Sequence, residues 1–351
     1  MGNLPSQRSA GYKPGLAWFA AIGSLWVFLL VTLGAFTTSI GAGMIFADWP
    51  LSNGSVNPTG WLNDVYMFAE HSHRLTGAAM GLITIGLAIW IWRREPRGWL
   101  RKLGWSALVV VIVQGLIGGQ RVMLDRMLIP GFGMTVGQLL RIPHGMLAQI
   151  YICILIAIAV SLSRPWIERS ISVPRHIRIA GIVTCALLLV QLAIATVMRH
   201  NGAGLAIPYF PWATAEHSWL PESWPFPVAI HFAHRLMAVV LGISLVVFAL
   251  MIRLDSTLPK MMRALATVLI MLLVIQITLG AEIIWTLRDP EMTTGHVVVG
   301  ALLLASTFML TWLAHRNAIE GSAGRAWDVE RIRVSPLDLT ANPRRELPQD
   351  S

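Results

Sequence analysis

The chain has 351 residues, of which 55% are hydrophobic and only 13% are charged, and its mean hydropathy is +0.63. This composition excludes a soluble globular domain and is typical of an integral membrane protein. The formal net charge of +9 lies largely in one set of loops, so it does not indicate a nucleic-acid-binding protein.

Eight apolar segments, each about long enough to cross a bilayer as a helix, follow one another along the chain. They cover residues 17–37, 73–92, 104–120, 143–162, 178–198, 228–252, 264–285 and 294–314. We therefore predict an all-α integral membrane protein with eight transmembrane helices. The two cysteines, Cys153 and Cys185, lie within these spans, and a disulfide framework is not indicated.

Basic side chains are concentrated on one side of this arrangement. They are concentrated in both terminal segments and in the loops after the second, fourth and sixth spans, whereas the other loops hold more acidic residues. By the positive-inside rule, both termini are cytoplasmic in a cell's inner (plasma) membrane, and the other loops are outer. Anionic membrane lipid is the partner expected from the basic loops.

The stretch "EHSHR", residues 70–74, stands at the mouth of the second span. Charged and imidazole groups so close to hydrocarbon indicate a functional site by default. Glu70 lies one helical turn before His73, so both side chains share a helix face. The carboxylate can act in proton transfer or stabilise a developing positive charge. An ion pair with Arg74 or Arg121 is an equally weighted alternative.

The second half of the chain repeats the first. The stretch "GAGMIFADWP" from Gly41 matches "GAGLAIPYFP" from Gly202, 161 residues later, and the same offset puts "HFAHR" from His231 on "EHSHR". Further on, "VQGLIGG" from Val113 matches "IQITLGA" from Ile275. This repetition predicts two pseudo-symmetric four-helix bundles, related as parallel repeats by an axis along the membrane normal.

The predicted division of the chain follows from the spans and the repeat. It comprises an N-terminal segment at 1–16, an N-terminal four-helix half at 17–163, a linker at 164–177, a C-terminal four-helix half at 178–316 and a polar tail at 317–351.

Four of the ten histidines occupy equivalent places in both halves: His73 with His234, and His144 with His296. A single histidine near a helix end is more often a hydrogen-bonded side chain than a ligand. Two facing imidazoles at equal depth in a four-helix bundle instead favour a bis-histidine haem site, one in each half. The other histidines, His176, His200, His217 and His315, are predicted to be solvated, and His71 to be a neighbour of the site.

Two arginines, Arg74 and Arg235, each follow a candidate ligand. A guanidinium there is predicted to bind a haem propionate, with lipid phosphate as the alternative. Gln114 and Gln276 are interpreted as contacts between helices that pack through small residues.

The motifs "EHSHR", "VQGLIGG", "IPHG", "HFAHR", "TTGH" and "GAGMIFADWP" resemble the haem A synthase family over about residues 17–314. The resemblance implies an eight-helix enzyme that oxidises the C8 methyl of haem O to a formyl group, giving haem A for cytochrome c oxidase. It implies that His73 and His144 face the substrate haem, that His234 and His296 ligate a resident haem b, and that Glu70 acts catalytically beside the substrate.

Further expectations follow from this resemblance. The partners would be a haem O synthase and cytochrome c oxidase assembly proteins, and a homo-oligomer is left open. Some members of the family carry a cysteine pair in the first outer loop, but this loop has Ser52 and no cysteine. A thiol–disulfide role for the loop therefore cannot apply to this chain.

Two other classes of protein compete with this interpretation. A di-haem b, quinone-linked electron-transfer cytochrome explains the four histidines equally well, but it does not explain why Glu70 replaces a histidine in one half only. A transporter would also contain repeats. Its polar groups would lie near the bilayer midplane, whereas here they lie at the outer ends, so it ranks last.

Overall fold

The structure, a computed structural model, describes residues 11–131 and 133–321. Within these ranges the chain is helical, and eight helices are long and apolar enough to cross a membrane. The helices are α1 (Pro14–Ser39), α2 (Val65–Arg94), α3 (Gly98–Met123), α4 (Val136–Leu162), the short α5 (Arg164–Glu168), α6 (Arg175–His200), the 3-10 turn η1 (Ala203–Leu205), α7 (Phe226–Leu254), α8 (Lys260–Trp285) and α9 (Pro290–Ala314). The prediction of an all-α, multi-pass membrane protein with eight spans is confirmed.

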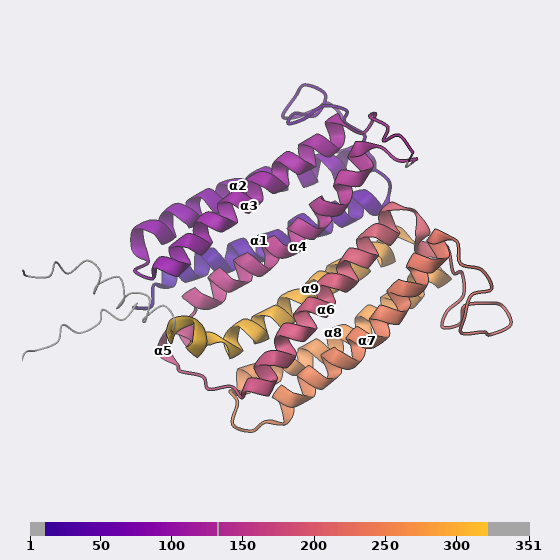
Figure 1. Cartoon of the computed structure of the whole chain (residues 1–351). Helices are drawn as coiled ribbons and strands as arrows, with labels where there is room; N and C mark the ends of the chain where they lie inside the picture. The colour runs from indigo at the N-terminus through magenta and orange to yellow at the C-terminus, as the bar shows by residue number, and fades with distance from the viewer. Residues whose placement is uncertain (1–10, 132, 322–351) are drawn as a thin grey trace, which may run out of the picture.

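The eight long helices form two groups of four that lie side by side (Figure 1). In the first group, α1 packs on α2, α2 on α3, α3 on α4, and α4 back on α1; α6, α7, α8 and α9 contact one another in the same cyclic order. Between the groups, α9 contacts α1 and α4, and α4 contacts α6. We call α1–α4 the N-terminal half and α6–α9 the C-terminal half. Of the predicted terminal segments, residues 1–10 and 322–351 lie outside the described residues.

Several helices begin earlier than their apolar segments predict. Helix α2 starts at Val65 because the Asp64 side chain accepts hydrogen bonds from the backbone N–H groups of Tyr66 (2.9 Å) and Met67 (2.8 Å). Helix α4 starts at Val136, where Thr135 and Gln138 form a capping box. Such polar caps satisfy the free N–H groups of the first turn and are invisible to a hydropathy window. The groups predicted at a helix mouth therefore lie inside the helices.

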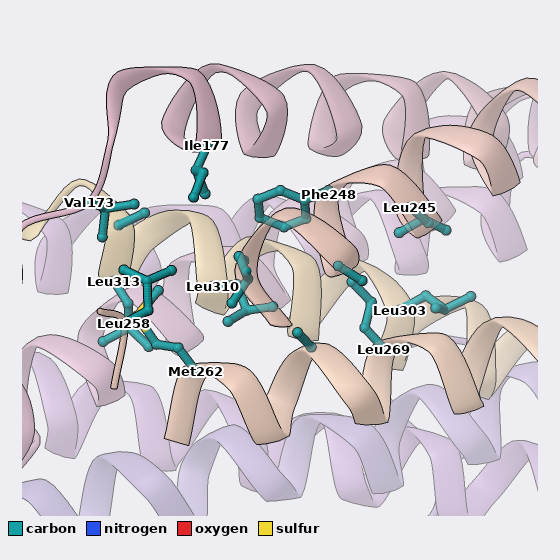
Figure 2. Close-up of a cluster of buried hydrophobic side chains, with 14 of the residues drawn as sticks. Val173, Ile177, Leu245, Phe248, Leu258, Met262, Leu269, Leu303, Leu310 and Leu313 are labelled. Atoms are coloured by element: carbon teal, nitrogen blue, oxygen red, sulfur yellow. The ribbon is translucent and has the colours of Figure 1, made fainter. Parts of the chain in front are cut away.

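The two ends of the bundle differ in character. The histidine end comprises the connections 40–64, 124–131 with 133–135, 201–225 and 286–289, and the opposite end comprises the connections 95–97, 163–174 and 255–259. In the C-terminal half, buried apolar side chains such as Phe248, Met262 and Leu310 fill the interior toward the opposite end (Figure 2). Large apolar side chains such as Leu25 (70% exposed) and Leu82 (71% exposed) face outward, as expected for a surface in contact with lipid.

A polar and aromatic cluster at the opposite end joins the two halves. Arg97, between α2 and α3, contacts Glu95 at 2.7 Å and Glu320, beyond α9, at 3.0 Å. The indole N–H of Trp166 donates to the same Glu320 carboxylate (2.7 Å), and the Trp166 ring stacks on Trp312. Because Glu95 is 3% exposed, this network lies under the protein surface, where its contacts resist screening by salt.

The Glu95 contact makes stability depend on pH. Burial by itself would raise the pKa of the Glu95 carboxyl, but hydrogen bonds and charge from Arg97 outweigh burial and hold the pKa below its ordinary value. Since the folded-state pKa is the lower one, the stabilisation is complete above the unfolded pKa and is lost as pH falls through the folded pKa. We expect Glu95→Gln to lower the free energy of unfolding near pH 7 by about 1–3 kcal/mol.

Thermal melting of the purified protein in detergent, followed at pH 7 and at pH 4, checks this expectation. The difference between wild type and Glu95→Gln should shrink at the lower pH. Glu168→Gln is the matched control, because the Arg164–Glu168 pair is exposed and contributes little. Equal melting curves for Glu95→Gln and wild type at pH 7 would contradict the expectation.

Candidate functional site

The structure places the four paired histidines at the histidine end, well inside their helices. His73, His144 and His234 each stand eight residues after the first residue of α2, α4 and α7, and His296 stands six residues after the first residue of α9. At about 1.5 Å per residue, these offsets are roughly 12 Å and 9 Å along the helix axes. The imidazoles therefore lie at similar depths in the two halves.

The structure brings the C-terminal pair together. The ring centroids of His234 and His296 are 6.4 Å apart, and the ring planes make an angle of 63°. Nδ1 of His296 lies 3.1 Å from the backbone carbonyl oxygen of Gln276, to which it donates, so Nε2 keeps the lone pair of the ring. Gln191, on α6, lies 3.0 Å from Nδ1 of His234 and donates to the His234 carbonyl (3.0 Å). Glutamines on α6 and α8 thus hold both rings.

The N-terminal pair is more open. Nδ1 of His73 donates to the carbonyl oxygen of Leu30 (3.2 Å), and Gln114 donates to the carbonyl oxygen of His144 (2.9 Å). Nδ1 of His144 is buried and has no hydrogen-bond partner. Among the described residues, no ring contact joins His73 to His144, in contrast to the C-terminal pair. A ring contact between the paired histidines is thus recorded, among the described residues, in the C-terminal half alone.

Glycines leave room for three of the four imidazoles. A Cβ atom added at Gly34, Gly118 or Gly280 would lie 2.7, 2.9 or 3.2 Å from Cε1 of His73, His144 or His296, respectively. Any larger side chain at these positions would displace the ring. Gly118 and Gly280 are equivalent residues of "VQGLIGG" and "IQITLGA". The small residues of these motifs therefore accommodate the histidines as well as the neighbouring helices.

Glu70 and Arg74 attach the first loop of the histidine end to α2. The Glu70 carboxylate is 4% exposed, accepts hydrogen bonds from the backbone N–H groups of Ile45 (2.7 Å) and Phe46 (3.1 Å), and contacts Arg74 at 2.6 Å. The ion pair weighed as an alternative is thus present, and its partner is Arg74. Arg74 also donates to the carbonyl oxygens of Phe46 (3.0 Å), Asp48 (2.6 Å) and Leu51 (2.6 Å).

The C-terminal half repeats this attachment with a histidine in place of the carboxylate. The backbone N–H of Ile207 donates to Nδ1 of His231 (3.2 Å), whose Nε2 lies 3.3 Å from Nε of Arg235. Arg235 donates to the carbonyl oxygens of Ile207 (3.0 Å), Tyr209 (2.7 Å) and Trp212 (2.9 Å), each 161 residues after its counterpart in the first loop. We call these two sets of contacts the loop anchors. Both predicted propionate-binding arginines are engaged in them.

The remaining histidines divide into three kinds. His71 is buried, lies 2.9 Å from the Ser52 hydroxyl and packs on Trp61, so it contacts the first loop beside the site. His176 and His217 are exposed, as predicted. The prediction of solvated rings is wrong for His200 and His315, which are half-buried because they end helices that pack against neighbours.

Comparison with known proteins identifies the family. The family of cytochrome oxidase assembly proteins named COX15-CtaA matches residues 16–308. The chain belongs to this family. The heme A synthase of Geobacillus kaustophilus is 27% identical to it over 328 residues, which are 89% of this chain and 97% of the relative. The heme A synthase of Shouchella clausii is 25% identical over 301 residues, or 84% of this chain and 94% of the relative. The family predicted from the motifs is thus confirmed.

Sequence reasoning missed several polar residues that this member of the COX15-CtaA family places around the histidines. The position equivalent to Gln191 in the first half is Leu30, so the repeat did not indicate a role for Gln191. Arg121 was considered only as a possible ion-pair partner of Glu70, and no role was predicted for Arg141 and Arg199, which lie in the first or last turns of apolar helices. Their neighbours come from other helices, which a single sequence does not reveal.

Proposed function

We propose that this protein is a haem A synthase, which oxidises the C8 methyl of haem O to a formyl group and gives haem A for cytochrome c oxidase. The observation that carries the proposal is the duplicated histidine pair, whose members lie at similar depths in both halves and at ring contact in the C-terminal half. Membership of the COX15-CtaA family and the names of the relatives support it.

The residues of the C-terminal half fit a bis-histidine haem. A metal ion bound to one nitrogen of each ring at about 2 Å can lie between His234 and His296, whose ring centroids are 6.4 Å apart. The Oε1 atoms of Gln191 and Gln276 are buried without a hydrogen-bond partner. With its side-chain amide turned over, Gln191 would accept from Nδ1–H of His234 and leave Nε2 of that ring for the metal. We assign haem b to this pair; when bound there, it supplies one-electron transfer.

The N-terminal half suits a substrate that must enter and leave. His73 and His144 face the haem O substrate, and the unpartnered Nδ1 of His144 fits a ring that awaits its ligand or hydrogen-bond partner. The Glu70 carboxylate fixes the first loop over this half and is the acidic group assigned to the reaction. The assignment of propionates to Arg74 and Arg235 remains a prediction, because backbone carbonyls bind both guanidinium groups.

The conversion of a methyl to a formyl group removes four electrons in two successive oxidations and takes up one oxygen atom, so it requires an external electron acceptor and an oxygen source such as water or dioxygen. The second oxidation gives a geminal diol, which loses water to form the aldehyde. The chain's own residues orient the substrate ring and, through the anchored loop, restrict the access of bulk water to it. We place the protein in the cell's inner membrane with both termini in the cytoplasm. A haem O synthase and cytochrome c oxidase assembly proteins are the proposed partners.

Mass analysis of extracted pigment tests the proposal. The protein is purified from cells that also express a haem O synthase, and its haems are extracted and weighed. We expect haem b together with haem A or its hydroxylated precursor. If the wild type holds haem b alone, with no oxidised product in the membranes, the synthase fails and a di-haem electron-transfer cytochrome takes its place.

A further inference from the structure

A row of three arginines and one histidine crosses the histidine end from one half to the other. Arg121 lies in the last turns of α3, Arg141 in the second turn of α4, and Arg199 and His200 at the end of α6. All four are half-buried. Among the described residues only Arg141 of this row has an ion-pair partner, Asp125, at 3.0 Å. The row therefore carries more positive than negative charge within the protein.

Two of these guanidinium groups use little of their hydrogen-bonding capacity. A guanidinium has five N–H donors. Arg121 donates from one amino group to the carbonyl oxygen of Gly43 (3.2 Å), and its buried Nε has no partner. Arg199 donates from one amino group to Ala35 and Ser39 of α1 (2.9 Å each). Arg74 and Arg235, in contrast, are each bound to three backbone carbonyls.

The two underused arginines lie beside different histidine pairs. Arg121 stands three residues after Gly118 on α3, and a Cβ atom added at Gly118 would lie 2.9 Å from Cε1 of His144. Arg199 donates to the Ser39 hydroxyl (2.9 Å), which also receives the hydroxyl of Thr294 (3.1 Å), two residues before His296. Each half thus has one arginine without an ion pair next to its candidate haem site.

A half-buried cation without a counter-ion is costly in an apolar bundle unless an anion joins it. A haem carries two carboxylates on its edge, and the planar guanidinium binds a carboxylate through two parallel hydrogen bonds. We propose that Arg199 binds a propionate of the resident haem in the C-terminal half and that Arg121 binds a propionate of the substrate haem in the N-terminal half. This inference rests on the proposed function, and it replaces the propionate contacts predicted for Arg74 and Arg235, whose guanidinium groups are occupied in the loop anchors.

A haem whose propionates are esterified shows how much of the binding affinity depends on the contact between arginine and propionate. Haem-free protein in nanodiscs is titrated with haem b and, separately, with its dimethyl ester, and binding is followed by absorbance. We expect Arg199→Gln to weaken the binding of haem b roughly tenfold to hundredfold and to leave the binding of the ester at the wild-type value. In protein already loaded with haem b, Arg121→Gln should weaken the binding of haem O and leave the binding of the haem O dimethyl ester at the wild-type value.

Two controls keep the test decisive. Arg126→Gln removes an exposed charge from the same end of the bundle and should change neither titration. Arg199→Lys keeps the positive charge but lacks the two parallel N–H donors of a guanidinium group. Its affinity for haem b should fall less than that of Arg199→Gln. An equal loss for haem b and its ester, or no loss for either, overturns the proposal. Wild-type protein that binds haem b in this way but makes no haem A would instead refute the synthase and leave the arginine contact standing.

Discussion

Alanine at His234 or at His296 is expected to abolish the haem b absorbance of the purified protein. The two rings lie at 6.4 Å on helices from opposite sides of the C-terminal half, so each variant leaves a site with a single protein ligand. Even outer residues that merely orient a metal ligand change affinity by roughly 10- to 100-fold, and loss of the ligand itself should exceed that. The measurement is haem b per mole of protein, from the Soret band and extracted pigment.

Two further variants control this result. His217→Ala removes an exposed ring from the loop of the same half and should retain haem b in full. His73→Ala should also retain it, because His73 belongs to the other half, while the binding of haem O is lost. The helical circular dichroism of each variant must match wild type for the comparison to hold. Full retention of haem b in both His234→Ala and His296→Ala would refute the assignment of the resident site.

Glu70→His is expected to keep the fold and haem b but to reduce haem A formation by about a hundredfold or more. The C-terminal half shows that a histidine can replace a carboxylate in a loop anchor, because His231 receives the Ile207 N–H just as Glu70 receives the Phe46 N–H. The variant therefore keeps an acceptor for the Phe46 N–H, but it loses the carboxylate together with the Ile45 N–H contact and the ion pair with Arg74. The measurement is the ratio of haem A to haem O in membranes that contain a haem O synthase.

The reverse exchange supplies the matched control. His231→Glu should keep haem b and wild-type haem A formation, since it installs the anchor of the other half beside Arg235. Glu70→Ala should lose activity too, but it also frees the backbone N–H groups of Ile45 and Phe46, so it cannot separate the two roles. Wild-type activity in Glu70→His would show that Glu70 serves the loop alone.

The spans and the duplicated histidines were predictable because each depends on local composition or on the repeat. An apolar run of membrane length needs no knowledge of its neighbours, and a fixed offset pairs His73 with His234 directly. Helix starts were less accurate, because Asp64 and Thr135 extend α2 and α4 through polar capping bonds that hydropathy does not register.

What the sequence could not give depends on contacts between distant segments. The acceptors of Arg74 and Arg235 are backbone carbonyls of loops, which every residue type offers and no motif marks. His200 was expected in solvent because it ends a helix, but neighbouring helices half-bury it. The role of Glu70 stayed open for the same reason, since its partners Ile45 and Phe46 act through their N–H groups.

The contacts between the halves have a consequence for assembly. In the repeat α1 corresponds to α6 and α4 to α9, so the α1–α9 and α4–α6 contacts join equivalent pairs of helices, with α4–α9 between them. That is the pattern of an isologous dimer interface, in which one surface binds a copy of itself. The surface with which the N-terminal half binds the C-terminal half of its own chain would therefore fit the C-terminal half of a second chain equally well. Domain swapping, in which two chains exchange halves across the 163–174 connection, would build a homodimer without any new interface.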